Sequence, residues 1–96
     1  MEFKITTNKS INDIMRQIGY MPAYFQKAGE ISVVRLLSKN DYPRFHLYIK
    51  QSGQDFSFNL HLDQKKPSYS GSHAHSGEYD GDVIEGEADR IKSLLK

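Results

Sequence analysis

Two stretches of alternating apolar and polar residues constrain the fold of this chain more than any other feature of its sequence. The first runs through residues 44–51 and the second through residues 55–63. A period of two is typical of a strand with one buried and one exposed face. The apolar positions are Phe45, Leu47 and Ile49 in the first stretch, and Phe56, Phe58, Leu60 and Leu62 in the second.

The short connection between the two stretches predicts an antiparallel hairpin. A tight turn at Ser52 and Gly53 places apolar residues opposite each other throughout. The predicted pairs are Ile49 with Phe56, Leu47 with Phe58, and Phe45 with Leu60, with Arg44 opposite His61 and His46 opposite Asn59 on the polar side. A slip of one residue would set apolar against polar side chains, so the pattern determines which residues share a face.

Two amphipathic segments are predicted to cover the apolar face of this hairpin. In residues 10–19, Ser10 and Asp13 resemble a capping box, apolar residues follow at helical spacing, and Gly19 supplies a stop. In residues 82–95, Asp82 and Glu85 again look like a capping pair ahead of an apolar stripe. We therefore expect one helix before the strands and one after them.

The remaining segments complete an α+β prediction. In residues 31–37, apolar side chains occupy both odd and even positions, which indicates a strand buried on both faces or central in its sheet. Residues 20–29 fit either an aromatic loop or a fourth strand. With 96 residues, the chain is expected to form one domain, residues 1–96. Its predicted architecture is a two-layer sandwich of helix, an antiparallel meander of three or possibly four strands, and helix.

Composition narrows the classes of function. The chain has no cysteine, which excludes disulfides, thiolate metal sites and a cysteine nucleophile. No apolar run is long enough for a spanning helix, and the first residues lack the apolar core of a signal peptide, so we expect a cytoplasmic protein without membrane contact. The net charge is +1, but acidic residues crowd positions 78–89, where they would repel a polyanion.

Residues 64–81 form a long Ser-, Gly- and His-rich connection, which is usually functional or mobile at such a length. His73 and His75 would project to the same side of an extended segment, and Glu78, Asp80 or His61 could complete a shell around a divalent ion. Zinc, manganese or iron would suit this set of nitrogen and oxygen ligands. The alternative is a solvated loop whose histidines bind nothing.

The polar face of the hairpin is the second candidate site. It offers hydrogen-bonding groups and a stackable ring, to which Tyr79 of the long loop could add. The candidate residues are Arg44, His46, Tyr48, Asn59, His61 and Tyr79. RNA could dock there, and the order of helix, three strands and helix resembles the double-stranded RNA-binding domain. That family grips phosphate with basic residues at the start of its last helix, where this chain has Asp82, Glu85 and Glu87.

These features favour a small noncatalytic module that binds a protein or small ligand through the sheet face and the long loop. A metal-binding protein or metal-dependent enzyme is the alternative, and an RNA-binding module is a second one. No catalytic residue is predicted, because the serines of the loop lack the spacing of a nucleophile elbow. Arg35 stands among apolar neighbours, which raises the question of whether a second copy packs on the open sheet face.

Overall fold

The computed structural model describes residues 1–23, 28–64, 77–78 and 81–96, with only the backbone described at 77–78. Its elements follow in the order β1 (Glu2–Thr6), α1 (Ile11–Ile18), β2 (Met21–Pro22), β3 (Ile31–Leu36), β4 (Arg44–Ser52), β5 (Asp55–Asp63), β6 (Gly77–Glu78) and α2 (Asp82–Leu95). The α+β class and the antiparallel sheet are confirmed. The detailed layout differs from the sandwich predicted above.

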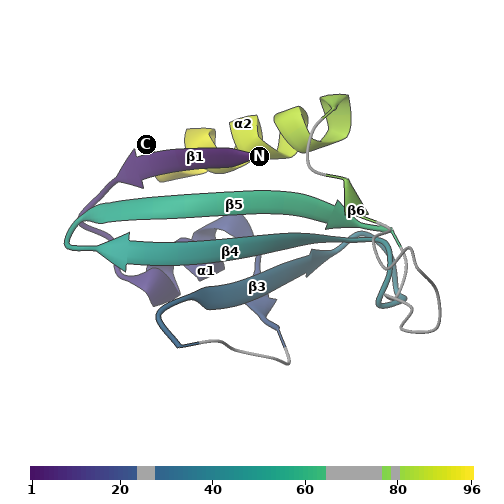
Figure 1. Cartoon of the computed structure of the whole chain (residues 1–96), viewed down its shortest axis with the longest axis horizontal. Helices are drawn as coiled ribbons and strands as arrows, with labels where there is room; N and C mark the ends of the chain where they lie inside the picture. Colours follow the sequence, from purple (N-terminus) through teal and green to yellow (C-terminus); the bar gives the residue numbers. More distant parts are fainter. Residues whose placement is uncertain (24–27, 65–76, 79–80) are drawn as a thin grey trace.

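The strands of the described residues form one sheet in the order β1-β5-β4-β3-β2, and β6 pairs with β5 beyond the N-terminal start of β1 (Figure 1). The prediction missed β1, so the order of helix, three strands and helix is wrong, and the topological resemblance to the RNA-binding domain does not hold. Phe3 and Ile5 alternate with polar residues, and the Phe3 ring stacks on Phe58 at 5.2 Å between ring centroids. This apolar pair explains why β1 joins the β5 edge.

The register of the central hairpin differs by two residues from the predicted one. Ser52 pairs with Asp55, so the turn lies at Gly53 and Gln54. Gly53 has φ +62°, as a hairpin turn with glycine at its first central position requires. Moving the turn by one residue shifts the pairing by two. The observed partners are Ile49 with Phe58, Leu47 with Leu60, Phe45 with Leu62, Arg44 with Asp63, and His46 with His61. Each side chain keeps its predicted face.

Both helices pack on one face of the sheet, behind it in the view of Figure 1. Ile14 and Ile18 of α1 and Ile84 and Ile91 of α2 are fully buried against the apolar row of the hairpin. Since each fully buried aliphatic side chain is worth about 1.5–3 kcal/mol, this layer dominates the stability of the fold. The opposite face has no helix over it in the described part of the chain.

The two helices begin differently. Ser10 caps α1, because its Oγ accepts a hydrogen bond from the Asp13 backbone N–H at 3.1 Å, and Gly19 closes the helix in the left-handed region. The predicted capping role of Asp82 in α2 is wrong: Gly81 is the N-cap and no side chain caps the first turn. None of the described helices is both long and apolar enough to cross a bilayer.

Strand β3 lies inside the sheet, where Ser32, Val33 and Val34 are buried on alternating faces. The open choice at residues 20–29 is partly resolved, because Met21–Pro22 forms a two-residue edge strand on β3. Residues 24–27 lie outside the described residues.

Arg35 projects from β3 toward the helices and not toward the open face. Its Nη1 lies 3.4 Å from Oε1 of Glu87, whose side chain is only 4% exposed. Arg90 donates two hydrogen bonds to the same carboxylate, at 2.7 and 2.9 Å, and the Tyr20 hydroxyl donates a third at 2.6 Å. This buried network gives Arg35 its partner, so the residue no longer points to a second copy on the open face.

Candidate functional site

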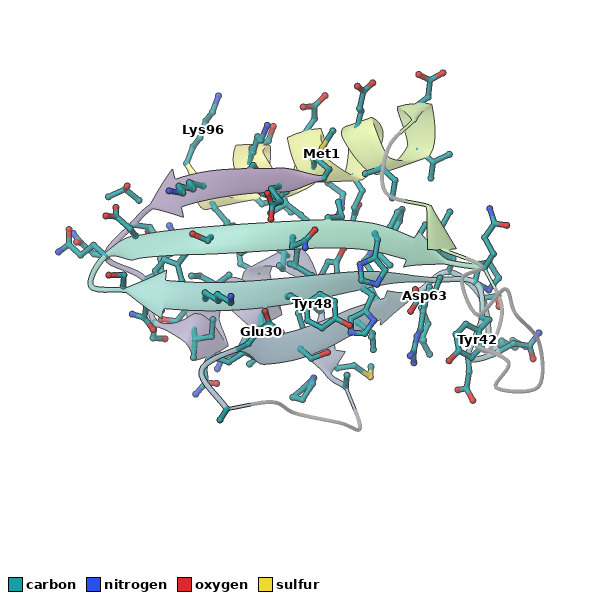
Figure 2. All side chains as sticks on the ribbon, viewed as in Figure 1. Met1, Glu30, Tyr42, Tyr48, Asp63 and Lys96 are labelled. Atoms are coloured by element: carbon teal, nitrogen blue, oxygen red, sulfur yellow. The ribbon has the colours of Figure 1, made fainter. Side chains whose placement is uncertain are left out.

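The face of the sheet opposite the helices carries the polar side chains of β4 and β5, and we call it the helix-free face. In Figure 2, Tyr48 and Asp63 lie in front of the sheet and the helices behind it. The hairpin contributes Arg44, His46, Tyr48 and Lys50 from β4, and Ser57, Asn59, His61 and Asp63 from β5.

Two imidazoles meet at the centre of this face. His46 and His61 are direct cross-strand partners, and their ring centroids are 4.9 Å apart. The ring of Tyr48 stacks on His46 at 4.4 Å and lies 5.3 Å from the His61 ring. The side chains of His46 and His61 are only 12% and 10% exposed. The pair is therefore largely shielded from water although no described helix covers it.

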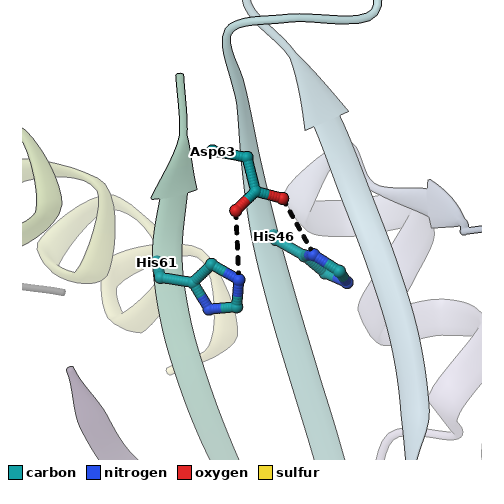
Figure 3. A group of neighbouring side chains, drawn as sticks. All are labelled: His46, His61 and Asp63. Atoms are coloured by element: carbon teal, nitrogen blue, oxygen red, sulfur yellow. Dashed lines mark hydrogen bonds and ion pairs between the residues drawn. The ribbon is translucent and has the colours of Figure 1, made fainter. Parts of the chain in front are cut away.

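Asp63 bridges the two imidazoles from the end of β5 (Figure 3). Its Oδ2 lies 3.1 Å from His46 Nδ1, and its Oδ1 lies 3.3 Å from His61 Nε2. Because an ionised carboxylate can only accept hydrogen bonds, each of these ring nitrogens is the donor in the metal-free protein.

The surroundings of Asp63 keep its carboxyl group ionised. Partial burial raises the pKa of Asp63, but hydrogen bonds from His46 and His61, with the charge of these rings when protonated, outweigh the burial and hold this pKa well below its usual range. Arg44 adds a positive charge, with its Nε 3.6 Å from Oδ2. The Arg44 guanidinium also lies over the Tyr42 ring, 4.6 Å from its centroid.

A buried hydroxyl holds the far side of the His46 ring. Ser32 Oγ, from β3, is 2.5 Å from His46 Nε2, and Ser32 is 5% exposed. When His46 Nδ1 donates to Asp63 and the ring is neutral, Nε2 accepts from the Ser32 hydroxyl. Side chains from three adjacent strands thus determine the orientation of one ring.

The structure brings together some of the predicted site residues. Arg44, His46 and His61 surround Asp63, whereas Tyr48 and Asn59 line a neighbouring hollow of about 270 Å³ that extends toward Lys50 and Lys4. His73, His75, Tyr79 and Asp80 lie outside the described residues, and Glu78 is described only by its backbone, which pairs with Leu62. The predicted loop site is therefore not tested.

Sequence reasoning missed Ser32 and Asp63. A usable signal existed for Asp63, because residues two apart in a strand share a face and Asp63 follows His61 at that spacing. No comparable signal existed for Ser32, which comes from a strand whose register was not predicted.

The cluster has the composition and spacing of a metal site. His46, His61 and Asp63 each offer one ligand atom, and these atoms all lie within 4.8 Å of one another. Bonds of about 2.0–2.2 Å to one ion place neighbouring ligand atoms roughly 3.0–3.5 Å apart. The distances from His46 Nδ1 to Oδ2 and from His61 Nε2 to Oδ1 of Asp63 fall in that range, although each runs to a different oxygen, so the ligands would have to move closer around one ion. Two imidazoles and one carboxylate suit zinc, iron or manganese.

The hydrogen bonds from Ser32 to His46 and from His46 to Asp63 connect the same three residue types as the catalytic triad of a serine hydrolase. A nucleophile must be reachable, and the oxyanion it generates needs donors aimed at it. Ser32 is nearly buried near the start of β3, a strand that has β4 on one side and β2 on the other. We therefore interpret Ser32 as a residue that orients His46 and not as a nucleophile.

Comparisons with known proteins add no family assignment: no family model matches this chain, and the searches of curated proteins and of solved structures likewise return no match. The geometry of the site is therefore the only guide to the function of this chain.

Proposed function

We propose that this protein is a noncatalytic metal-binding module that holds a divalent transition-metal ion on the helix-free face through His46, His61 and Asp63. The observation that carries the proposal is the convergence of two imidazole nitrogens and one carboxylate within 4.8 Å. The proposal keeps the binding surface expected from the sequence and moves the metal from the loop histidines to the sheet.

One candidate ligand, His46, has the kind of supporting hydrogen bond that metal ligands usually have. Metal-binding imidazoles generally donate their second N–H to an acceptor that fixes the ring, and His46 has Ser32 Oγ in that position. When His46 Nδ1 binds the ion, its proton can reside on Nε2 and be donated to Ser32. The change from the metal-free state then needs a tautomer shift and little movement of the ring.

Zinc best fits these ligands, because it accepts nitrogen and oxygen donors without a strict geometric preference. A purely structural cluster is the competing explanation, since a carboxylate between two imidazoles is satisfied without any ion. Only a binding measurement separates the two.

The test is a titration of the metal-free protein with Zn²⁺, Mn²⁺ and Fe²⁺, with oxygen excluded for Fe²⁺. Calorimetry and the NMR resonances of the histidines monitor binding. We expect Zn²⁺ to bind with a Kd below about 1 μM, equivalent to about −8.2 kcal/mol. His61→Gln and Asp63→Asn should each raise this Kd at least about 100-fold, because a lost ligand costs no less than a lost supporting contact.

Asn59→Ala is the matched control, since Asn59 lies on the same strand and face, two residues from His61, and offers no metal ligand of the cluster. It should change the Kd less than about twofold. The combined variant His73→Ala/His75→Ala examines the loop site predicted from the sequence. Zinc binding that is lost in the loop variant but unchanged in His61→Gln and Asp63→Asn would show that the sheet cluster is not the site.

A further inference from the structure

A second hollow lies at the other end of the domain, where the end of β1 meets the C-terminal end of α2 (Figure 1). Its volume is about 500 Å³, within the range of about 300–1,000 Å³ that is usual for small-ligand sites. We call it the lysine hollow. Its lining consists of Lys4, Ile5, Thr6, Thr7, Asn8, Lys9, Lys92, Leu95 and Lys96.

The charges around this hollow are unbalanced. Lys4, Lys9, Lys92 and Lys96 contribute four ammonium groups, and no aspartate or glutamate is among the lining residues. One lining residue contacts an acid outside the hollow: Oδ1 of Asp55 accepts a hydrogen bond from Thr6 Oγ1 at 2.6 Å. Like charges that share a concave surface repel each other and raise the local positive potential, which favours an anion there.

Most of the other basic side chains that the structure describes do have an acidic partner, and Lys39, which is exposed on the surface, is the exception. Every described arginine has a carboxylate partner, and so does Lys50, which lies 3.8 Å from Glu30. None of the four lysines of the hollow makes an ion pair within the described residues, although Lys92 lies over the Phe3 ring at 5.1 Å. Apart from Lys39, the lysines that lack an acidic partner among the described residues therefore line one hollow.

Helix electrostatics explains only half of this cluster. Lys92 and Lys96 lie in the last turn of α2 or directly after it, where the negative end of the helix dipole favours cations. Lys4 and Lys9 come from β1 and the connection to α1, where no such reason applies. Two separate segments thus supply charge of the same sign to one hollow.

We propose that the lysine hollow binds a ligand that carries several consecutive phosphate groups. Ammonium groups bind phosphate oxygens as point charges, and the Thr7 hydroxyl and the Asn8 amide are further donors of the kind that contact phosphates. The hollow has a finite volume and no aromatic ring among its lining residues on which bases could stack. These features favour a small phosphorylated ligand over a nucleic acid strand.

Inorganic tripolyphosphate is the direct probe, titrated into metal-free protein by calorimetry and by NMR of the lysine side chains. At about 10 mM salt, where the Debye length is about 30 Å, we expect a Kd below about 100 μM. At about 150 mM salt the screening length falls to about 8 Å, and the affinity should drop at least about 10-fold. Inorganic phosphate should bind more weakly under both conditions.

The variants Lys9→Gln/Lys92→Gln and Lys4→Gln/Lys96→Gln should each raise the tripolyphosphate Kd at least about 10-fold, which corresponds to about 1.4 kcal/mol. Lys39→Gln is the matched control, because Lys39 is exposed, lacks an ion pair among the described residues and lies outside the hollow. It should change the Kd less than about twofold. NMR spectra of each variant confirm that the fold is intact.

Two results would overturn the proposal. One is a tripolyphosphate Kd above about 1 mM at low salt. This result would overturn the proposal even if a single-stranded RNA oligomer bound to the protein. The other is an equal loss of affinity in Lys39→Gln, which would indicate nonspecific attraction to the whole surface. Neither result depends on the metal site, which lies on the helix-free face.

Discussion

Replacing Glu87 with glutamine should destabilise the protein far more than an ordinary charge change on a helix. The Glu87 side chain is 4% exposed, and its carboxylate accepts one hydrogen bond from Tyr20, two from Arg90 and a longer one, at 3.4 Å, from Arg35 Nη1. Glutamine retains one carbonyl oxygen but places an NH₂ group where Oε2 faces donors from Tyr20 and Arg90. At least one guanidinium N–H then loses its acceptor.

The expected cost follows from burial. Breaking a fully buried ion pair by removing one partner costs about 3–5 kcal/mol. Arg35 and Arg90 keep 35% and 33% of their side chains exposed, so water replaces part of the lost interaction. We therefore expect a loss of about 2–3 kcal/mol, against the roughly 5–15 kcal/mol typical of a natural domain. The variant should still fold.

Urea unfolding followed by circular dichroism measures this loss. With an m-value of about 1–3 kcal/mol/M, the midpoint should fall by roughly 0.7–3 M while m stays constant. Glu85→Gln is the matched control on the same helix, because Glu85 is exposed and makes no ion pair within the described residues, and it should change stability by less than about 0.5 kcal/mol. A midpoint shift for Glu87→Gln no larger than that of Glu85→Gln would refute the reasoning.

Three further outcomes are expected. Burial, followed by the hydrogen bond to Glu87, raises the pKa of Tyr20 well above its usual value of 10.0, so only the unfolded state loses this proton above pH 10. The stability advantage of the wild type over Tyr20→Phe should therefore shrink by about 1.4 kcal/mol per pH unit above 10 in urea titrations, and a constant gap would contradict the assignment. Ser32→Ala should weaken zinc binding about 10-fold without abolishing it, because the ring of His46 loses its support. Arg44→Gln should strengthen zinc binding about 10-fold, because a unit positive charge roughly 6 Å from a divalent ion costs about 1.4 kcal/mol even in a water-like dielectric. Weaker binding in calorimetry would argue against an ion beside Asp63.

Much of the architecture is encoded locally and could be predicted. The alternation in residues 44–51 and 55–63 indicates two strands and assigns every side chain in them to a face. Apolar spacing, with Ser10 and Gly19 as end signals, predicts α1 to within a residue or two. These features follow from the periods of strand and helix, which depend on neighbours in the chain and not on tertiary contacts.

The candidate site depended on tertiary structure, because alternation determines a face but not a register. A shift of two residues preserves every apolar pair, so the sequence pattern alone allows His46 to face either Asn59 or His61. The turn at Gly53 and Gln54 selects His61 and thereby brings Asp63 to the same pair of rings. Ser32 joins them only because β3 pairs with β4 in one particular register.

Long-range packing likewise decided which charges are buried. Glu87 looks like one more member of an exposed acidic run, and Arg35 like an isolated charge among apolar residues. They are 52 positions apart and meet only when α2 packs on the sheet that contains β3. The sequence by itself thus determined the elements and their faces, through periodicities that act over a few residues. Pairing partners and buried charges were left to the tertiary structure, because the free energy that selects them comes from contacts between distant segments.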